Sequence, residues 1–464
     1  PSMRLYWHQR DLRTRDNVAL SATAATGDPV VPVYVYDPEA LGTVGTRQRA
    51  FLMHGVRALK ERYRDLGSDL LVRKGTPSDV LGDLAAEYGA ETVGYADHYR
   101  PARRTRQRSV ERTLGTAGID VESWTDLVLV DPGRLDASYP NHGRFYDDWQ
   151  RVPKSPPAEE PAPESLADVS DGTTVPTPTV DIDLPDAGYA AARDRFDDFL
   201  ETGIYSYNDT RDDLARAVAA PTSAVSRLSP YLAAGMIGVR ELWADATDVH
   251  DAVNGGEARN VDKFRYELSW REQNYHLLYH NPDLGEANYK SFPNDIAWRD
   301  DDDAFEAWVA GETGYPLVDA GMRQLDREGY VHNRPRQVVA SFLTKHLLID
   351  WRRGARHFQR KLLDHDYASN NANWQWIAST GTDSVDVRIF DPVSQLSKYD
   401  DDATYVREYV PELRGVPAGK VVDWPTLSRG ERESLAPDYH HPIVDRNEGY
   451  ERAQRVFERA LGKR

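Results

Sequence analysis

Short apolar runs alternate with helical periods over the first hundred residues of the chain. The apolar or β-branched runs are 4–9 (RLYWHQ), 30–36 (VVPVYVY), 69–73 (DLLVR) and 92–96 (TVGYA). Between them, the apolar positions of 46–66 and 77–88 recur with a helical period. Strand alternating with helix predicts an α/β domain built on a doubly wound parallel sheet of the Rossmann-like type. A further helix is expected to carry Arg103–Arg108 (RRTRQR) on a solvated face, in preference to the alternative of a phosphate site.

The pattern changes in the middle of the chain. Residues 152–188 are rich in Pro, Asp, Glu, Ser and Thr and show no sustained periodicity, which is typical of an extended connector. Strand signals then disappear, and helical periods follow at 189–202, 230–247, 257–280, 302–310, 316–328, 335–351, 353–363 and 448–461. We therefore predict an α/β domain over 1–130, an extended interdomain linker over 131–188 and an all-helical domain over 189–464.

Composition narrows the possible classes of protein. The 464 residues contain 75 Asp and Glu against 57 Lys and Arg, a net charge of −18, which suggests a carboxylate-rich surface adapted to high salt. The chain contains no Cys, which excludes disulfides, thiolate catalysis and Cys-ligated metals, and its His spacing predicts no metal site. No apolar run approaches the roughly 20 residues of a membrane helix, so we expect a cytoplasmic protein without a membrane partner.

One stretch, Leu362–Asp383, is too polar and too aromatic for an ordinary core segment. It combines two carboxylates, three amides and two indoles: Asp364, Asp366, Asn370, Asn371, Asn373, Trp374 and Trp376. We expect it to bind a planar, polar ligand.

The predicted helix 257–280 carries a second unusual face. Glu267, Trp270, Arg271 and Asn274 are spaced i, i+3, i+4 and i+7, which places them together. A core face would not carry Glu and Arg, and a solvated face would rarely carry Trp. This pattern favours a binding surface.

Two predicted helix starts offer free backbone N–H groups to an anionic or carbonyl-bearing ligand. Pro335 sets the start of the helix after Asn333 and Arg334. Ser226–Ser229 precede Pro230 and would suit a pyrophosphate, although a plain helix capped by Ser229 explains the same pattern equally well.

An ordered set of motifs over nearly the whole chain resembles the photolyase/cryptochrome family, most closely its class I cyclobutane pyrimidine dimer photolyases. The opening WHQRDLRTRDN at Trp7–Asn17 is similar to the family's WFRRDLRLxDN. The other motifs are Ser226–Ser229, Trp270–Glu272, Gly314–Pro316, Met322–Leu325, His332–Arg334, Trp374–Trp376 and Thr380–Asp383.

The resemblance implies an N-terminal antenna domain and a helical domain that holds FAD, active as FADH⁻. Arg336 would pair with Asp364 beside the isoalloxazine, Asp366 would hold the flavin's polar edge or the ribityl chain, and Asn370 would face flavin N5. The implied cofactor-binding residues are Tyr207, Val225, Ser226, Arg227, Leu228, Ser229, Phe264, Glu267, Arg271, Asn274, Asn333, Arg336, Asp364, His365, Asp366 and Asn370. The antenna site would hold 8-hydroxy-5-deazaflavin or methenyltetrahydrofolate, or stay empty.

The implied activity is that of a deoxyribodipyrimidine photo-lyase, a carbon–carbon lyase. Excited FADH⁻ would pass an electron to a cyclobutane dimer flipped out of DNA, and the ring would split. The implied lesion- and DNA-binding residues are Arg211, Glu267, Trp270, Asn333, Arg334, Gln337 and Trp376, with the two indoles as stacking walls. A tryptophan relay would use Trp298, Trp351 and Trp374, which from spacing alone read equally as three core residues.

Three positions depart from the family pattern. Gln337 stands where class I dimer photolyases usually have Met, Val225 replaces the usual Thr, and the segment after Asp383 is about one residue shorter. The alternatives are a cryptochrome photoreceptor without repair activity and a (6-4) photolyase. Cryptochromes commonly extend far beyond the last helix, which here is the predicted 448–461, so we expect a repair enzyme, as a monomer acting on DNA that contains pyrimidine dimers.

Overall fold

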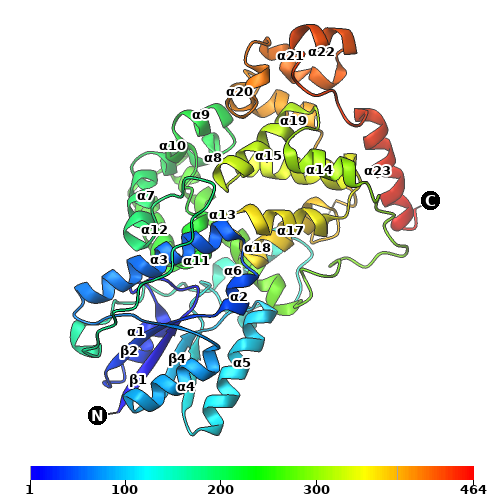
Figure 1. The fold of residues 1–464 in the computed structure, drawn as a ribbon. Coiled ribbons are helices and arrows are strands. Elements are labelled where there is room, and N and C mark those ends of the chain that lie inside the picture. The colour runs from blue at the N-terminus through cyan, green and yellow to red at the C-terminus, as the bar shows by residue number, and fades with distance from the viewer. Residues whose placement is uncertain (1, 384, 464) are drawn as a thin grey trace.

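The computed structural model describes residues 2–383 and 385–463, arranged as a sheet domain beneath a larger helical domain (Figure 1). Five parallel strands pair in the order β3-β2-β1-β4-β5. Their bounds are β1 Met3–His8, β2 Val30–Tyr36, β3 Leu71–Lys74, β4 Ala90–Ala96 and β5 Asp120–Trp124. The doubly wound α/β prediction is confirmed. Strand β5 was not predicted, because this edge strand (DVESW) has no fully buried residue to produce an apolar run.

Helices cover both faces of the sheet. They are α1 Val18–Ala24, α2 Pro38–Gly42, α3 Thr46–Asp65, α4 Pro77–Tyr88 and α5 Pro101–Thr116. Leu81 of α4 and Val110 of α5 pack with the sheet in one core, whereas Phe51 and Val56 of α3 join a second core that continues into the helical domain. Helix α3 therefore links the two domains through apolar contacts.

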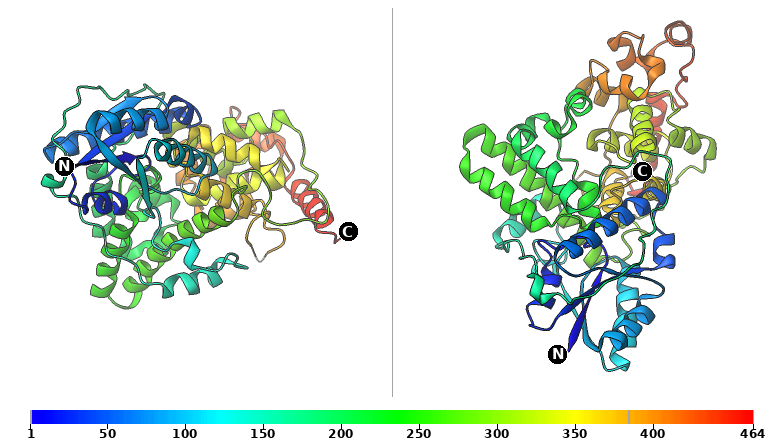
Figure 2. Two further views of the ribbon diagram at one scale, coloured as in Figure 1. Left: turned by 90° about the horizontal axis from the view of Figure 1, so that it is seen from below. Right: turned by 60° about the vertical axis from the view of Figure 1, so that its left-hand side comes forward.

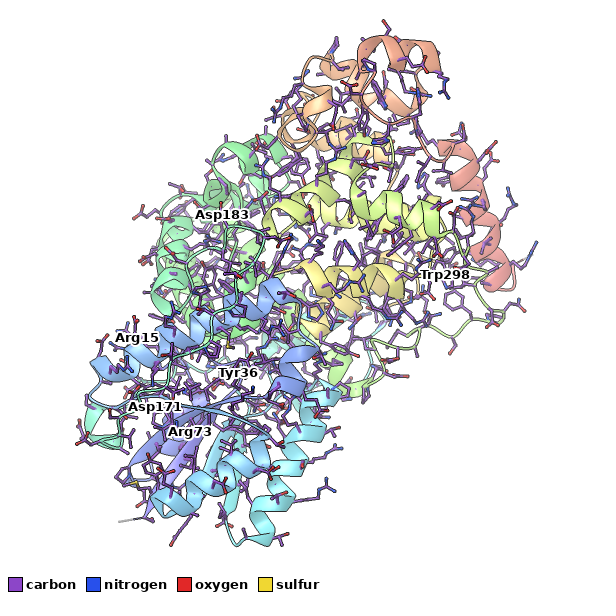
Figure 3. The ribbon with its side chains drawn as sticks, in the orientation of Figure 1. Arg15, Tyr36, Arg73, Asp171, Asp183 and Trp298 are labelled. Carbon is purple, nitrogen blue, oxygen red and sulfur yellow. The ribbon has the colours of Figure 1, made fainter. Side chains whose placement is uncertain are left out.

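We predicted an extended connector over 131–188, but part of this segment is helical. Helix α6, His142–Arg151, lies within it and buries Phe145 and Trp149. The following residues 152–188 are irregular apart from a short 3₁₀ turn at Pro163–Ser165. Where they pass the sheet, Asp171 accepts from Arg73 at 3.1 Å (Figure 3).

The second domain is helical. Its helices are α7 Tyr189–Glu201, α8 Tyr207–Thr210, α9 Leu214–Ala219, α10 Pro221–Ala224, α11 Ser229–Ala234, α12 Val239–Ala252, α13 Gly255–His280, α14 Asp302–Ala310, α15 Pro316–Glu328, α16 Asn333–Ser341, α17 Trp351–Lys361, α18 Tyr367–Ile377, α19 Pro392–Tyr399, α20 Thr404–Tyr409, α21 Ala418–Val422, α22 Arg429–Leu435 and α23 Arg446–Ala460. None of these described helices is both long enough and apolar enough to cross a bilayer.

Two predicted helices are broken. The helix expected over 230–247 ends at Gly235, which has φ of +67°, and a Cβ there would lie 1.9 Å from the Arg10 carbonyl oxygen of the sheet domain. The helix expected over 335–351 ends after a π-helical turn at Phe342–His346, and α17 starts anew at Trp351. Because Gly235 has no side chain, the backbone at the first of these breaks can lie directly against the sheet domain.

The short helices α19 to α22 form the lobe farthest from the sheet, and α23 returns along the side of the helical domain (Figures 1 and 2). Helix α23 lies against the π-helical turn, where a Cβ on Gly449 would meet His346 at 3.2 Å. These short helices of the far lobe were not predicted, since few of them span the two turns needed to show a period.

Candidate functional site

A cavity of about 310 Å³ lies within the helical domain. Most of the residues expected to bind FAD or the lesion line it. They are Tyr207, Ser226, Leu228, Ser229, Phe264, Glu267, Arg271, Asn333, Arg336, Gln337, Asp364, His365, Asp366, Asn370, Trp374 and Trp376. Side chains from five separate segments, α8, the turn before α11, α13, the start of α16 and the region of α18, therefore converge on one space.

Helix α18 and the residues just before it form one wall of the cavity, with Asp364, His365, Asp366, Asn370, Trp374 and Trp376. Asp366 caps the helix by accepting from the Ser369 N–H at 2.7 Å, and the same carboxylate accepts from the Tyr275 hydroxyl of α13. Asn370 donates from its amide nitrogen to the Ala355 carbonyl at 3.0 Å. Capping and cross-helix hydrogen bonds thus fix the polar end of α18.

Arg336 and Asp364 form the pair that the sequence predicted. The guanidinium donates from Nη2 at 2.9 Å and from Nη1 at 3.3 Å, and the Ser229 hydroxyl donates to the same carboxylate at 2.7 Å. Burial alone would lower the pKa of Arg336, but Asp364 raises it overall, so the cation persists. Ser229 therefore does not cap its helix; the N-cap of α11 is Leu228, without a side-chain bond.

Two residues in the lining have buried polar atoms that find no hydrogen-bond partner in the described part of the chain. They are Oε1 of Gln337 and Nε2 of His365. Burial lowers the pKa of His365 to about 3, so its ring is neutral and can either donate or accept. Unpaired buried polar atoms are costly, which indicates that the cavity is built for a ligand with polar groups.

Three residues expected at the cofactor lie outside the lining: Val225, Arg227 and Asn274. Arg227 has φ of +52°, and its guanidinium lies over the Tyr330 ring at 4.3 Å and bonds Glu328 at 3.3 Å. Asn274 is buried on the flank of α13, because at 100° per residue the cavity-facing positions centre on Phe264, Leu268, Arg271 and Tyr275.

The expected DNA contacts Arg211, Trp270 and Arg334 also lie outside the lining, and their neighbours connect them to it. Arg211 donates to Glu267 at 3.1 Å, and Arg334 donates to Asp212 at 3.0 Å. The Trp270 ring meets Trp376 edge-to-face, with centroids 6.5 Å apart. Arg211 and Trp270 thus contact lining residues, and the charges of Arg211 and Arg334 are already paired inside the protein.

Sequence reasoning missed several lining residues, among them Tyr275 and Phe358. Tyr275 lies one turn after Arg271, so continuing the helical period of α13 would have found it. Phe358 belongs to α17 and reaches the cavity only through tertiary packing. No pattern in the sequence separates it from a core residue.

The three relay tryptophans lie in three environments. Trp374 lines the cavity, and a Cβ on Gly354 of α17 would lie 2.3 Å from its ring. Trp351, three residues before that glycine, is fully buried and donates from Nε1 to Asn288 at 2.9 Å. Trp298 is half-buried beside α23, where it meets Phe457 at 5.8 Å (Figure 3).

A smaller cavity of about 80 Å³ lies in the sheet domain. Its lining includes four arginines, Arg10, Arg100, Arg103 and Arg106. Burial lowers the pKa of Arg10 to about 10 and that of Arg103 well below its usual value, and neighbouring guanidinium groups add to both shifts. The prediction that the RRTRQR run lies on a solvated face is therefore wrong for Arg103 and Arg106, because both side chains line this cavity.

Comparisons with known proteins agree with this geometry. A family profile described as the FAD binding domain of DNA photolyase matches residues 264–459, and one described as DNA photolyase matches residues 4–164. A deoxyribodipyrimidine photo-lyase of Halobacterium salinarum is 44% identical in an alignment that covers 99% of this chain and 100% of the relative. A relative from Halobacterium salinarum fits the expectation of a protein adapted to high salt.

Solved structures match over the same length. A bacterial class III photolyase from Agrobacterium tumefaciens superposes with a TM-score of 0.89 at 34% identity, covering 100% of this chain and 98% of that one. A cryptochrome from Synechocystis superposes with a TM-score of 0.89 at 28% identity, covering 98% of this chain and 99% of that one. The chain therefore belongs to the photolyase/cryptochrome family.

Proposed function

We propose that this protein is a light-driven DNA repair enzyme, a deoxyribodipyrimidine photo-lyase that splits cyclobutane pyrimidine dimers. One observation carries the proposal. A single cavity is lined both by the polar residues suited to a flavin, Asp364 and Asn370, and by an indole suited to a flipped base, Trp376. A lesion bound there would lie next to the cofactor, which is the arrangement that electron transfer to a dimer requires.

FAD is the cofactor of this family's helical domain, and the residues present fit it. Arg336 and Asp364 would hold the flavin through a charge-assisted pair, and Ser226 and Ser229 would reach the polar chain. The unpaired atoms of His365 and Gln337 supply hydrogen-bonding capacity that no group within residues 2–383 and 385–463 uses. When bound in its reduced form, FAD supplies the electron that splits the cyclobutane ring.

The remaining work of the site is done by the protein's own groups. Trp376 and Trp270 would stack on the flipped pyrimidines, a contribution on the order of 1–3 kcal/mol per base. Glu267 and Asn333, both in the lining, would hydrogen-bond the base edges. Arg211 and Arg334 would contact the strand's phosphates, exchanging their present carboxylate partners for them.

For the electron relay, we keep the order Trp374, Trp351 and Trp298. Trp374 is the member in the cavity wall, and Trp298 is the member with an exposed edge. Helix α17 connects the first two through Gly354 and Trp351. An electron would pass from Trp298 through Trp351 to Trp374 and so reach the cavity.

We assign an antenna chromophore to the smaller cavity, where the cluster of arginines favours an anionic molecule such as 8-hydroxy-5-deazaflavin or methenyltetrahydrofolate. The cavity would have to widen for a ring system of that size. We also retain a division into 1–130, 131–188 and 189–464, and we propose a cytoplasmic monomer that binds DNA with pyrimidine dimers and does not bind membranes.

The test is a repair assay on two substrates. Reduced protein is illuminated with an oligonucleotide that contains one cyclobutane thymine dimer and, separately, with one that contains one (6-4) photoproduct. We expect the first to return to intact thymines and the second to remain unchanged. Repair of the (6-4) substrate instead would replace the proposed specificity.

The second candidate is a photoreceptor without repair activity, favoured by the superposition on the Synechocystis cryptochrome. Absence of repair of both substrates by protein whose FAD is photoreduced normally would establish this candidate. The assay therefore separates the two functions in one preparation.

A further inference from the structure

One face of the Trp270 indole is covered by a histidine from the connector. The rings of His142 and Trp270 are parallel within 7°, with centroids 3.8 Å apart. His142 is the first residue of α6, inside the segment 131–188. A flat ring at this distance is a full face-to-face contact.

His142 is held in place by both of its ring nitrogens. Nδ1 lies 3.0 Å from the Tyr266 hydroxyl and Nε2 lies 3.0 Å from the Ser269 hydroxyl. Both partners stand on α13 within a little more than one turn of Trp270, and the His142 side chain is only 4% exposed. The imidazole is therefore a fixed part of the domain and not a mobile cover.

The stack continues along α6. Tyr146 lies 6.0 Å from His142 at an interplanar angle of 22°, and Trp149 lies 6.1 Å from Tyr146 at 25°. The spacing i, i+4 and i+7 puts the three rings on one face of the helix. Trp149 is fully buried and packs edge-to-face against Trp243 of α12 at 5.2 Å. The column thus anchors the Trp270 ring to the interior of the protein.

We propose that His142 is a positioning residue for lesion recognition: it fixes the plane of Trp270 and leaves the opposite face, and the edge towards Trp376, for the flipped dimer. This inference rests on the proposed function, because it takes Trp270 as a wall of the lesion site. A half-buried indole that is already ordered loses little side-chain freedom when a base stacks on it. Binding of the flipped dimer gains from this order, whereas contacts to phosphates do not.

The experiment compares His142→Ala and His142→Phe with the wild type. Dissociation constants are measured at one salt concentration for two duplexes of the same sequence, with and without one thymine dimer. We expect His142→Ala to bind the dimer duplex about three- to tenfold more weakly and to bind the undamaged duplex unchanged. Phe keeps the flat ring but loses both hydrogen bonds, so the dissociation constant of His142→Phe should lie between those of the wild type and His142→Ala. FAD content and melting temperature report on folding.

Tyr266→Phe and Ser269→Ala provide a second route if His142→Ala does not fold. Each removes one hydrogen bond to the imidazole and keeps the stacked rings. Each should therefore lower the affinity for the dimer duplex by less than His142→Ala does. Arg151→Ala, at the exposed end of α6, is the matched control and should change neither dissociation constant.

Wild-type affinity for the dimer duplex in folded His142→Ala, or in both hydrogen-bond variants, would overturn the inference. His142→Phe as weak as His142→Ala would overturn it too, because stacking would then not be the cause. A wild-type protein without preference for the dimer duplex would overturn the proposed function itself. That result is visible in the wild type alone and so differs from failure of the inference.

Discussion

Arg240 of α12 and Asp16 of the loop after β1 form an ion pair across the domain boundary, with 2.7 Å between Nε and Oδ1 and side chains 3% and 1% exposed. Arg240 also pairs with Asp126 at 2.7 Å, and Asp126 pairs with Arg13 at 2.6 Å. Four buried charges thus hold the helical domain onto the sheet domain. Removing one partner leaves the others desolvated and unpaired.

We therefore expect Arg240→Met to lower the free energy of unfolding by about 3–5 kcal/mol, the range for breaking a buried pair. Urea unfolding at a fixed high salt concentration measures it. Arg429→Met is the control, because Arg429 and its partner Glu433 are 74% and 53% exposed and such pairs contribute at most about 1 kcal/mol. Equal effects of the two substitutions would show that burial of the network is irrelevant to stability.

Asp364→Asn should weaken FAD binding. The amide keeps the shape of the carboxylate but loses the charge that Arg336 and Ser229 share. Loss of a charged hydrogen bond costs about 2 kcal/mol, or roughly a thirtyfold rise in the dissociation constant of FAD. The ratio of flavin to protein absorbance after dialysis measures it.

The control for that substitution is Asp326→Asn on α15, whose carboxylate is 67% exposed and pairs with Lys361. It should retain FAD like the wild type. A fully loaded Asp364→Asn protein would show that the pair with Arg336 does not hold the cofactor.

Trp351→Phe should slow photoreduction of oxidised FAD and leave repair by chemically pre-reduced protein nearly intact, because the relay is needed only to reload the cofactor. The absorbance of oxidised flavin under continuous blue light gives the rate. Trp308→Phe is the matched control: this buried indole contacts Trp374 at 6.1 Å but leads away from the proposed route. The relay would be refuted by a variant at 351 that photoreduces at the wild-type rate.

Stability should fall as the pH is lowered from about 6.5 towards 4. Burial lowers the pKa of eight histidines: His142 and His365 to about 3, His276, His332, His346 and His357 to about 4, His98 well below its usual value, and His54 by a smaller amount. In the unfolded chain their pKa is about 6.5, so unfolding takes up protons in this window and the stabilisation present above pH 6.5 is lost below it. Asp400 has the opposite effect, because burial raises its pKa to about 7 and the folded protein therefore binds one proton that the unfolded chain releases in this pH range.

His346→Phe removes one of these titrating imidazoles and so measures its contribution to the pH dependence of stability. Both ring nitrogens of His346 are unpartnered and its ring stacks on Phe342 at 5.4 Å, so Phe fits the same contacts. Between pH 6 and 5 the slope of unfolding free energy against pH should decrease by about 1.4 kcal/mol per pH unit.

The elements that the sequence predicted well are those with long, uninterrupted periods. Helices α13, α14 and α15 begin and end within two residues of the expectation. The break at Gly235 was missed because its cause is distant: the chain turns there to approach Arg10, 225 positions earlier, a contact without a local signal. The same holds for the π-helical turn before α17.

The candidate site shows the same division. Asp364, Arg336 and Trp376 could be placed together through motifs, because each motif fixes a side chain on a known element. His142 could not, since an isolated His before an aromatic run is indistinguishable from a surface residue until α6 is packed on α13. Residues that support a site from a distant segment of the chain cannot be predicted from a single sequence.

Helix α18 places Trp374 and Trp376 in the wall of one cavity, two residues apart on a rigid helix. If one ligand tightens this helix, the other ligand binds to a wall that is already ordered, and the two binding free energies are then coupled. Thermodynamic linkage makes the coupling reciprocal: the factor by which cofactor strengthens the hold on damaged DNA must equal the factor by which damaged DNA strengthens the hold on cofactor. An enzyme built in this way loses its cofactor least readily while a lesion is bound.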